Sequence, residues 1–513
     1  MAFKGGIHPK YNKITAGSKI EKAGLPGKIV LPMSQHVGKP CEPIVNIGDY
    51  VRTGQKIAES DAFVSAPIHS SVSGTVKSVE ALPHPITGNP VKSVTIESDG
   101  KDDKVEMRER QYENLSNEEL KEIIREAGIV GLGGAAFPAH VKLSPPKDKN
   151  IDCLLINGAE CEPFLTTDHR LMVERADQLL EGIRIIRKIL ETKDVFIGIE
   201  KNKSDAVKLL SEKCKGQNIR VKALHAKYPQ GSEKKLIYAV NRRKVPAGGL
   251  PMDIGCVVQN VGTCLAVFEA VALSKSLYER VITVTGRVNR PKNILVRIGS
   301  SVKEAIEEAD NYKGQPKKII MGGPMMGFAL PTDELPVIKG TSGIIVFNKV
   351  DMDEKRQEIE CIRCGKCVQK CPMHLHPSLL ARYAQKGKFG LAEKTFAMDC
   401  YECGCCAFIC PSHIPLVHWI RYAKSEILRK RVERKKKEKK SKEAKGSEHA
   451  EKGRKTGESS EKKESEEEKK EEKQASNVPE SGKEKIGAEE SNEKPQAAEE
   501  YKKEDNPEED KKE

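Results

Sequence analysis

Two short cysteine-rich stretches late in the chain constrain its fold more than any other feature. "CIRCGKCVQKCP" begins at Cys361 and "CYECGCCAFICP" begins at Cys400. Both have the spacing Cys-x2-Cys-x2-Cys-x3-Cys-Pro, in which three thiolates lie on one tight loop and the turn before the proline directs the fourth elsewhere. This spacing predicts two [4Fe-4S] clusters, with the ligands Cys361, Cys364, Cys367, Cys371, Cys400, Cys403, Cys406 and Cys410.

The spacing leaves two alternatives of ligation open. Structural zinc sites also use Cys-x2-Cys pairs, although they usually need two separated pairs. In two-cluster ferredoxins the fourth cysteine of each set binds the other cluster, and the alternative is that each set holds its own cluster. Cys405, a ninth cysteine beside the second set, is interpreted as a non-ligand, and His374 and His376 as surface or packing residues.

The end of the chain differs in composition from the rest. From about Arg429 onward almost every residue is Lys, Glu, Ser, Gly or Ala, without apolar periodicity. Such a segment cannot bury enough apolar surface to offset the entropy of ordering it, so residues 429–513 are predicted to be disordered. The formal charge of +13 comes with interleaved Glu and only 4% aromatic residues. Nucleic acid is therefore not an expected partner, because bases need aromatic stacking surfaces.

The sequence predicts no membrane span. No stretch approaches the ~20 consecutive apolar residues of a membrane helix, and "MAFKGGIHPKYNK" lacks the apolar core of a secretory signal. The 15 cysteines are then expected in a reducing cytoplasm, where metal ligation and free thiols are favoured over disulfides. Any membrane contact would be peripheral.

Residues 29–96 predict a small all-β domain. Short β-rich runs alternate there with Gly and Pro turns, as in "GDYVRTGQKI" and "SAPIHSSVSGTVKSV". This pattern resembles the biotinyl/lipoyl-type barrel-sandwich module. Carrier versions have a lysine at a hairpin tip, where this chain has Asp61, Ala62 and Phe63. The resemblance therefore implies a docking or structural module that is not a carrier.

The middle of the chain predicts an α/β domain. "SNEELKEIIREAG" starts with a capping box and predicts a helix, and residues 170–190 predict one long amphipathic helix between the β-rich runs "CLLINGAE" and "DVFIGIE". Strand, helix and strand in this order are typical of a largely parallel sheet. Residues 281–310 predict two or three strands followed by a helix, which resembles the β-grasp module called SLBB.

A glycine-rich loop, "GLGGAAFPAHVKL", lies at residues 131–143. Glycines let a backbone approach a phosphate or a planar ring, and Lys142 can neutralise a phosphate charge. Clusters carry one electron at a time, so a two-electron donor upstream needs a cofactor such as a flavin. The loop alone is a weak signal, because such loops are often structural turns.

Four segments follow one another along the chain: "GLGGAAFP" with Lys142, "NGAECEP", "YPQGSEKKLI" and "NVGTCLAV". The NADH-binding flavoprotein subunit of respiratory complex I carries its Gly-rich, acidic, Tyr/Gly/Glu and Asn-Val-x-Thr segments in this order. With the β module in front and the cysteine sets behind, residues 1 to about 425 resemble the RnfC family, the C component of the Rnf (Rsx) ion-translocating electron transport complex.

The resemblance implies a set of cofactor contacts. The residues implied to bind FMN are Gly131, Gly133, Gly134, Lys142, Asn157, Glu160, Tyr228, Gly231, Asn260 and Thr263. Those implied to lie on the NADH side are Phe137, Glu162 and Glu233. In isolation each has a plainer interpretation, such as a core aromatic or a surface carboxylate. The chain departs from the complex I pattern at Ala136 (usually Gly), at Ser232 (usually acidic) and at Cys161 (usually Gly), which is interpreted as a small buried residue.

The resulting expectation is a multidomain α/β and α+β chain. It consists of a barrel-sandwich domain (1–110), a Rossmann-like FMN/NADH domain (111–275), an SLBB β-grasp domain (276–350), a helical two-cluster ferredoxin-like domain (351–428) and the tail (429–513). The resemblance implies an NADH-linked oxidoreductase subunit, peripheral on the cytoplasmic side of the membrane, that exchanges electrons between NAD(H) and ferredoxin-linked partners in a complex. The alternatives are a soluble NADH-oxidising iron-sulfur flavoprotein and a relay protein similar to cobalamin reductases.

Overall fold

The computed structural model describes residues 3–352 and 357–437. The chain divides into two units, Met1–Val432 and Glu433–Glu513. Most of the predicted tail lies outside the described residues. Residues 416–437 are helical, so the structure differs from the prediction of disorder over residues 429–437, where Lys, Arg and Glu are good helix formers.

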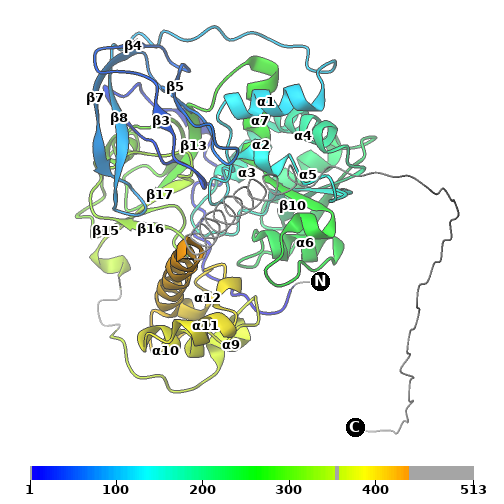
Figure 1. The fold of residues 1–513 in the computed structure, drawn as a ribbon, viewed down its shortest axis with the longest axis vertical. Helices are drawn as coiled ribbons and strands as arrows, with labels where there is room; N and C mark the ends of the chain where they lie inside the picture. The colour runs from blue at the N-terminus through cyan, green and yellow to red at the C-terminus, as the bar shows by residue number, and fades with distance from the viewer. Residues whose placement is uncertain (1–2, 353–356, 438–513) are drawn as a thin grey trace, which may run out of the picture. The chain divides into compact units, whose positions relative to one another are not determined.

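The barrel-sandwich domain consists of two antiparallel sheets. One has the order β2-β8-β7-β4 and the other β3-β5-β6; the strands are β2 (Lys28–Pro32), β3 (Glu42–Pro43), β4 (Tyr50–Val51), β5 (Lys56–Glu59), β6 (Ile68–His69), β7 (Gly74–Pro83) and β8 (Pro90–Ser98). The long β7–β8 hairpin lies at the left of Figure 1. Val94 and Ile96 alternate with more exposed residues along β8 and are fully buried, as expected for a strand with one buried face.

The first residues of the chain do not join these sheets. Strand β1 (Ile20–Lys22) pairs in parallel with β14 (Lys292–Arg297). The barrel-sandwich sheets therefore begin at β2, and β1 belongs to another sheet.

The α/β domain contains a four-stranded parallel sheet of order β11-β10-β9-β12. Its strands are β9 (Cys153–Gly158), β10 (Asp194–Glu200), β11 (Ile219–Leu224) and β12 (Cys256–Asn260). Its helices are α1 (Asn117–Glu126), α2 (Ala139–Lys142), α3 (Thr167–Glu174), α4 (Ala176–Leu190), α5 (Ser204–Lys213), α6 (Glu233–Asn241), α7 (Val261–Leu273) and the 3-10 turn η1 (Pro251–Ile254). Several of these helices lie around β10 in Figure 1.

Local signals of the sequence are visible in this domain. Ser116 accepts a hydrogen bond from the backbone of Glu119, whose side chain accepts one from Ser116 N at 2.8 Å, so the predicted capping box is confirmed. The helix predicted over residues 170–190 is two helices, because Arg175 leaves helical geometry (φ −128°, ψ 37°). The Arg175 guanidinium instead donates to Glu269 at 3.2 Å.

The β-grasp domain contains a six-stranded sheet of order β1-β14-β13-β17-β15-β16. Besides β1 and β14 it has β13 (Glu279–Gly286), β15 (Lys318–Met321), β16 (Phe328–Leu330), β17 (Gly343–Phe347), helix α8 (Val302–Glu307) and the turn η2 (Lys349–Asp351). Two strands followed by a helix match the expectation for residues 281–310.

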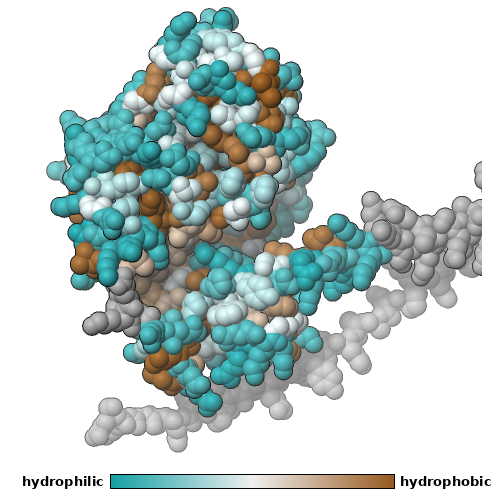
Figure 2. All heavy atoms as spheres, turned by 90° about the vertical axis from the view of Figure 1, so that its left-hand side faces the viewer, coloured by the Kyte–Doolittle hydropathy of each residue, from teal (hydrophilic) through white to brown (hydrophobic). Residues whose placement is uncertain are grey.

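The cysteine domain is helical. It contains α9 (Lys366–Lys370), α10 (Pro377–Gln385), α11 (Phe389–Lys394), η3 (Ala397–Asp399) and α12 (Cys405–Phe408) before the helix that begins at residue 416. These short helices form one group in Figure 1. On the face that Figure 2 shows, hydrophobic side chains form separate patches among hydrophilic ones.

The barrel-sandwich, α/β and β-grasp domains pack against one another. Buried hydrophobic residues of the barrel-sandwich and α/β domains form one continuous cluster. Lys339 of the β-grasp domain is 1% exposed, and its Nζ donates to Pro67 O at 2.6 Å and to Gly128 O at 2.7 Å. One side chain thus connects all three domains.

Candidate functional site

The carboxyl edge of the parallel sheet gathers several predicted FMN residues. Asn157, next to the last residue of β9, lies beside Asn260 at the end of β12, and the two are direct partners in register. The side-chain amide of Asn157 donates to Gly231 O at 2.8 Å. Ligands of open parallel sheets bind outside this edge, so the fold brings these three residues to the expected place.

The glycine-rich loop lies over the start of helix α7. Leu132 N donates to the Thr263 hydroxyl at 2.9 Å, and Thr263 is fully buried. A Cβ on Gly133 would lie 2.5 Å from Asn260 Nδ2, whereas no other described atom lies within 4 Å of a Cβ built on Gly134. Thr263 therefore anchors the loop, and Gly133 and Gly134 form its exposed upper surface.

The other end of the loop is closed by its own backbone. Gly131 N donates to Phe137 O at 2.8 Å, and the Phe137 side chain is 36% exposed. Ala136 has φ +53°, a conformation that glycine adopts at lower cost. Ala136 is 7% exposed and faces Gly340 of the β-grasp domain. The methyl group of Ala136 is therefore directed into the protein.

The Glu160 carboxylate accepts hydrogen bonds from the first residues of helix α3. The donors are Asp168 N, at 2.8 Å, and the Thr167 hydroxyl, at 3.1 Å. Asp168 in turn accepts from Asn260 Nδ2 at 2.7 Å, and burial raises the pKa of Asp168 to about 7. Asp168 is not among the residues predicted from the sequence, since an acidic residue in the first turn of a helix has an ordinary role there.

Lys142 and Glu233 meet across two helices. The Lys142 ammonium at the end of α2 forms an ion pair with the Glu233 carboxylate at the start of α6. Their side chains are 24% and 43% exposed. The ammonium predicted to bind phosphate and a carboxylate predicted on the NADH side are thus in direct contact.

Glu162 is half-buried at the boundary between the α/β and β-grasp domains. Its carboxylate accepts a hydrogen bond from Met325 N at 3.1 Å and faces Gly323, so it is directed towards a turn of the β-grasp domain. Burial raises the pKa of Glu162 to about 7, although the backbone hydrogen bonds oppose the shift. Cys161 is 8% exposed and accepts from Gly231 N at 3.2 Å, as expected for a small buried residue.

Tyr228 connects the α/β domain to the second cysteine set. Its side chain is 1% exposed, and its hydroxyl donates to Cys403 O at 2.8 Å and to Glu162 at 3.4 Å. Beside it, the buried amide nitrogen of Gln230 has no hydrogen-bond partner within the described residues. A buried orphan donor between Tyr228 and Gly231 fits a site that a polar ligand completes.

These residues fit an FMN. The glycine loop leaves backbone room at Gly134, Lys142 can balance a phosphate charge, and Gln230 supplies an unused donor. Flavin supplies exchange between two-electron and one-electron chemistry when bound. The other residues predicted to bind FMN contact one another and stabilise the glycine-rich loop and the carboxyl edge of the sheet.

Four cysteines surround one pocket at the surface of the cysteine domain. The pocket has a volume of about 290 Å³, and its lining includes Cys361, Cys364, Cys367 and Cys410. We call these four the outer cysteine group. Cys361 and Cys364 are exposed. No three His, Cys, Asp or Glu side chains within residues 3–352 and 357–437 are arranged to hold a single metal ion.

The other four cysteines lie close to one another in the interior. Burial raises the pKa of Cys400 to about 12, and the nearby thiolates of Cys403 and Cys371 add to the shift. The pKa of Cys406 is raised by burial and then by the other three. We call Cys371, Cys400, Cys403 and Cys406 the inner cysteine group. Cys371 thus lies with the second set and Cys410 with the first, which is the arrangement of crossed ligation.

The remaining candidates near the cysteines have other surroundings. Cys405 is fully buried and hydrogen-bonds the Cys403 thiol. His374 and His376 are exposed, as expected for surface residues. His376 also caps helix α10 by accepting a hydrogen bond from Leu379 N at 3.3 Å.

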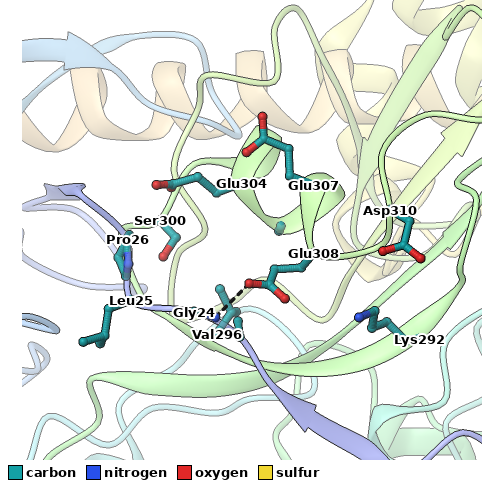
Figure 3. Close-up of a pocket in the computed structure, with 12 residues that line it drawn as sticks. Gly24, Leu25, Pro26, Lys292, Val296, Ser300, Glu304, Glu307, Glu308 and Asp310 are labelled. Carbon is teal, nitrogen blue, oxygen red and sulfur yellow. Dashed lines mark hydrogen bonds between the residues drawn. The ribbon is translucent and has the colours of Figure 1, made fainter. Parts of the chain in front are cut away.

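A pocket of about 390 Å³ lies in the β-grasp domain beside helix α8 (Figure 3). Its charged lining consists of one cation, Lys292, and four carboxylates, Glu304, Glu307, Glu308 and Asp310. Glu308 accepts a hydrogen bond from Gly24 N at 2.8 Å. This mainly acidic lining would repel phosphate groups, so the pocket does not fit FMN or a dinucleotide.

Within the described part of the chain, no helix is long and apolar enough to cross a membrane.

Comparison with protein families divides the chain into four matched regions. Residues 1–101 match the RnfC barrel sandwich hybrid domain, and residues 124–269 match the Nuo51 FMN-binding domain. Residues 281–329 match the SLBB domain, and residues 353–411 match the 4Fe-4S dicluster domain. The predicted fold class and cofactors, FMN and two [4Fe-4S] clusters, are thereby confirmed.

Curated relatives match over most of their length. The C component of the proton-translocating ferredoxin:NAD(+) oxidoreductase complex of Clostridium ljungdahlii is 50% identical over 430 residues, 83% of this chain and 94% of the relative. The Na(+)-translocating counterpart of Acetobacterium woodii is 45% identical over 435 residues, covering 84% and 98%. The C component of the ion-translocating oxidoreductase complex of Rhodobacter capsulatus is 40% identical over 434 residues, covering 83% of each. This chain therefore belongs to the RnfC family, the C components of ion-translocating ferredoxin:NAD(+) oxidoreductase complexes.

Proposed function

We propose that this chain is the NAD(H)-linked subunit of such a complex and exchanges electrons between NAD(H) and ferredoxin-linked partners through FMN and two [4Fe-4S] clusters. The hydrogen bond from Tyr228 to Cys403 O carries this proposal. It connects the sheet edge that fits FMN to the inner cysteine group, so both redox sites belong to one packed structure. The family match favours a member of a complex over the two alternatives.

The predicted residues have different roles in the proposed FMN site. Gly131, Gly133 and Gly134 offer backbone close to the cofactor, and Lys142 offers a positive charge for its phosphate. Asn157 and Gly231 shape one side of the sheet edge. Thr263 holds the loop from the other side, Asn260 caps α7, and Glu160 fixes the start of α3. The side chains orient the flavin, and no side-chain nucleophile is needed.

The proposed NADH side consists of Phe137, Glu233 and Glu162. Phe137 is partly exposed at the end of the glycine loop, where an aromatic ring can stack on a planar ligand. Glu233 stands next to Lys142, so its carboxylate can compete with a ligand phosphate for that ammonium. Glu162 is half-buried and contacts the β-grasp turn, so we assign it a positioning role on this side.

The two cysteine groups form a relay in this proposal. The inner group, Cys371, Cys400, Cys403 and Cys406, would hold the cluster that is closer to the flavin. The outer group, Cys361, Cys364, Cys367 and Cys410, would hold the cluster that is closer to the surface.

We also propose that the chain acts at the cytoplasmic side of the membrane as a peripheral subunit. The relatives are named as subunits of ion-translocating complexes, and ion translocation requires a membrane. The proposed partners are the other subunits of the complex and NADH, and nucleic acid is not among them.

Titration of the purified, reconstituted chain with NADH tests the proposed function. Flavin absorbance should bleach first, and cluster absorbance should follow as electrons leave the flavin. A chain that binds FMN but is not reduced by NADH would show that the proposed substrate is wrong.

Electron paramagnetic resonance (EPR) of single cysteine variants tests the two groups. Cys410→Ser should remove the same cluster signal as Cys364→Ser, and Cys371→Ser the same signal as Cys403→Ser, because a hydroxyl is a poor ligand for cluster iron. If Cys371→Ser removes the signal that Cys364→Ser removes, each set holds its own cluster and the crossed assignment fails.

A further inference from the structure

The first described residues of the chain are held on the α/β domain. Phe3 is 3% exposed, and Lys227 Nζ lies 4.7 Å from the centre of its ring and donates to Phe3 O at 3.0 Å. Ile7 forms an antiparallel bridge with Tyr228. Ile7 N donates to Tyr228 O at 2.9 Å, and Tyr228 N donates to Ile7 O at 3.0 Å. These contacts hold residues 3–7 on the α/β domain.

The same segment contacts the inner cysteine group through its backbone. Gly6 N donates to Lys370 O at 2.9 Å. Gly5 has φ +78°, and a Cβ at this position would lie 2.6 Å from Cys371 O. Both the conformation and the close approach require glycine here. Residues 3–7 therefore touch Tyr228 on one side and Cys371 on the other.

Tyr228 completes the connection, because its hydroxyl binds Cys403 O. Cys371 and Cys403 belong to the same inner group, although they come from different cysteine sets. We call residues 3–7 together with Tyr228 the N-terminal clasp. Two of the four inner cysteines are thus fixed to the α/β domain through it.

We propose that the N-terminal clasp is a positioning element that holds the inner cysteine group at a fixed separation from the FMN site and so sets the rate of electron exchange between them. This inference rests on the proposed function. Residues 3–7 would not touch flavin, NADH or iron, and they act through Cys371 and Tyr228. Electron exchange depends steeply on the separation of donor and acceptor, so a small displacement of the inner group changes the rate without changing cofactor content.

Gly5→Val and Gly216→Val form a matched pair for the test. Gly216 has nearly the same backbone conformation, φ +74°, but no described atom lies within 4 Å of a Cβ built there. Valine strains the backbone at both positions, whereas only Gly5→Val pushes against Cys371. Gly216 lies in a turn of the α/β domain after α5, outside the proposed cofactor site.

Three measurements on the full, reconstituted chain separate positioning from assembly. FMN and iron content and the NADH-to-ferricyanide rate, in which electrons leave at the flavin, should be equal in both variants and the wild type. Hydrogen exchange of peptides covering residues 366–376 should be faster only in Gly5→Val. Stopped-flow reduction of the clusters by NADH should be about tenfold slower only in Gly5→Val, as an ångström-scale misplacement can produce.

Faster hydrogen exchange in Gly5→Val with an unchanged rate of cluster reduction would overturn the proposal. If Gly5→Val does not retain iron, Phe3→Ala decides, because it removes only the ring that Lys227 contacts. Phe3→Ala with full iron content should also slow cluster reduction, and a wild-type rate in it would overturn the proposal. Failure of NADH to reduce the wild-type flavin would instead refute the proposed function, and the role of the clasp with it.

Discussion

Gly133→Ala should loosen the start of helix α7, whereas Gly134→Ala should leave it unchanged. A Cβ on Gly133 would lie 2.5 Å from Asn260 Nδ2 and 2.7 Å from Asn260 Cγ. These distances are about 1 Å inside normal nonbonded separations. No described atom lies within 4 Å of a Cβ on Gly134. Alanine therefore creates a steric conflict at Gly133 and none at the neighbouring Gly134, so the two variants form a matched pair.

Asn260 is the side chain that has to move in Gly133→Ala. Its Oδ1 caps α7 by accepting from Gly262 N at 2.8 Å and Thr263 N at 3.3 Å, and its Nδ2 donates to Asp168 at 2.7 Å. Loss of a helix cap costs about 1 kcal/mol, and loss of a hydrogen bond to a charged group costs about 1.5–3 kcal/mol. Partial loss of both gives about 2 kcal/mol, or roughly a 30-fold change in a local equilibrium.

Hydrogen exchange of peptides covering residues 256–268 in the full chain measures this opening. The amides of Gly262 and Thr263 should exchange roughly 30-fold faster in Gly133→Ala and at the wild-type rate in Gly134→Ala. FMN binding should weaken in Gly134→Ala without that change, if the cofactor lies against the exposed glycine. Equal exchange rates in the two variants would show that Asn260 does not bear the steric load.

Three further predictions concern other parts of the chain. Burial raises the Glu162 pKa from 4.5 to about 7, so its contribution to stability is present below pH 4.5 and is lost as the pH rises to about 7. In the wild type, the free energy of unfolding measured in urea should fall by up to about 3 kcal/mol across that pH range. Glu162→Gln should abolish this fall. Lys142→Ala should weaken FMN binding about tenfold by fluorescence titration, because it removes a charged hydrogen-bond donor, whereas Lys149→Ala should not. Gly182→Ala should destabilise the fold by about 3 kcal/mol or more in thermal unfolding, because its Cβ would lie 1.9 Å from a backbone oxygen of α7. Gly390→Ala, also in a helix but with open space around it, should stabilise by about 0.5–1 kcal/mol.

Features that depend on short stretches of sequence could be predicted. The cysteine spacing indicated two clusters because the four cysteines of each set lie within a stretch of twelve residues. The capping box at Ser116 and the parallel sheet followed from local patterns in the same way. The order of the flavin segments was informative only as a set, because each of them alone matches an ordinary turn or helix start.

Features that depend on single residues far apart in the chain could not be predicted. The contact of Tyr228 with Cys403 spans 175 residues, and no periodic pattern accompanies it. The pairing of β1 with β14 likewise joins two short segments across most of the chain. Glu162 has the composition of a surface loop around it, yet the β-grasp turn covers it. In each case tertiary packing decides the environment of a residue whose neighbours in sequence give no signal.

Two lysines, Lys13 with a side chain 10% exposed and Lys339 fully buried, bind backbone carbonyl groups where separate parts of the chain meet. Lys13 Nζ donates to Glu160 O and Glu162 O, both at 2.9 Å, and Lys339 joins three domains in the same manner. Burial lowers the pKa of both, to about 7 for Lys339, so these ammonium groups are costly unless their hydrogen bonds are made. Removing either lysine side chain while the junction stays closed would leave carbonyl groups without partners, at about 1–3 kcal/mol each. Because a relay needs fixed separations between redox sites, such junctions suit electron transfer better than hinges do.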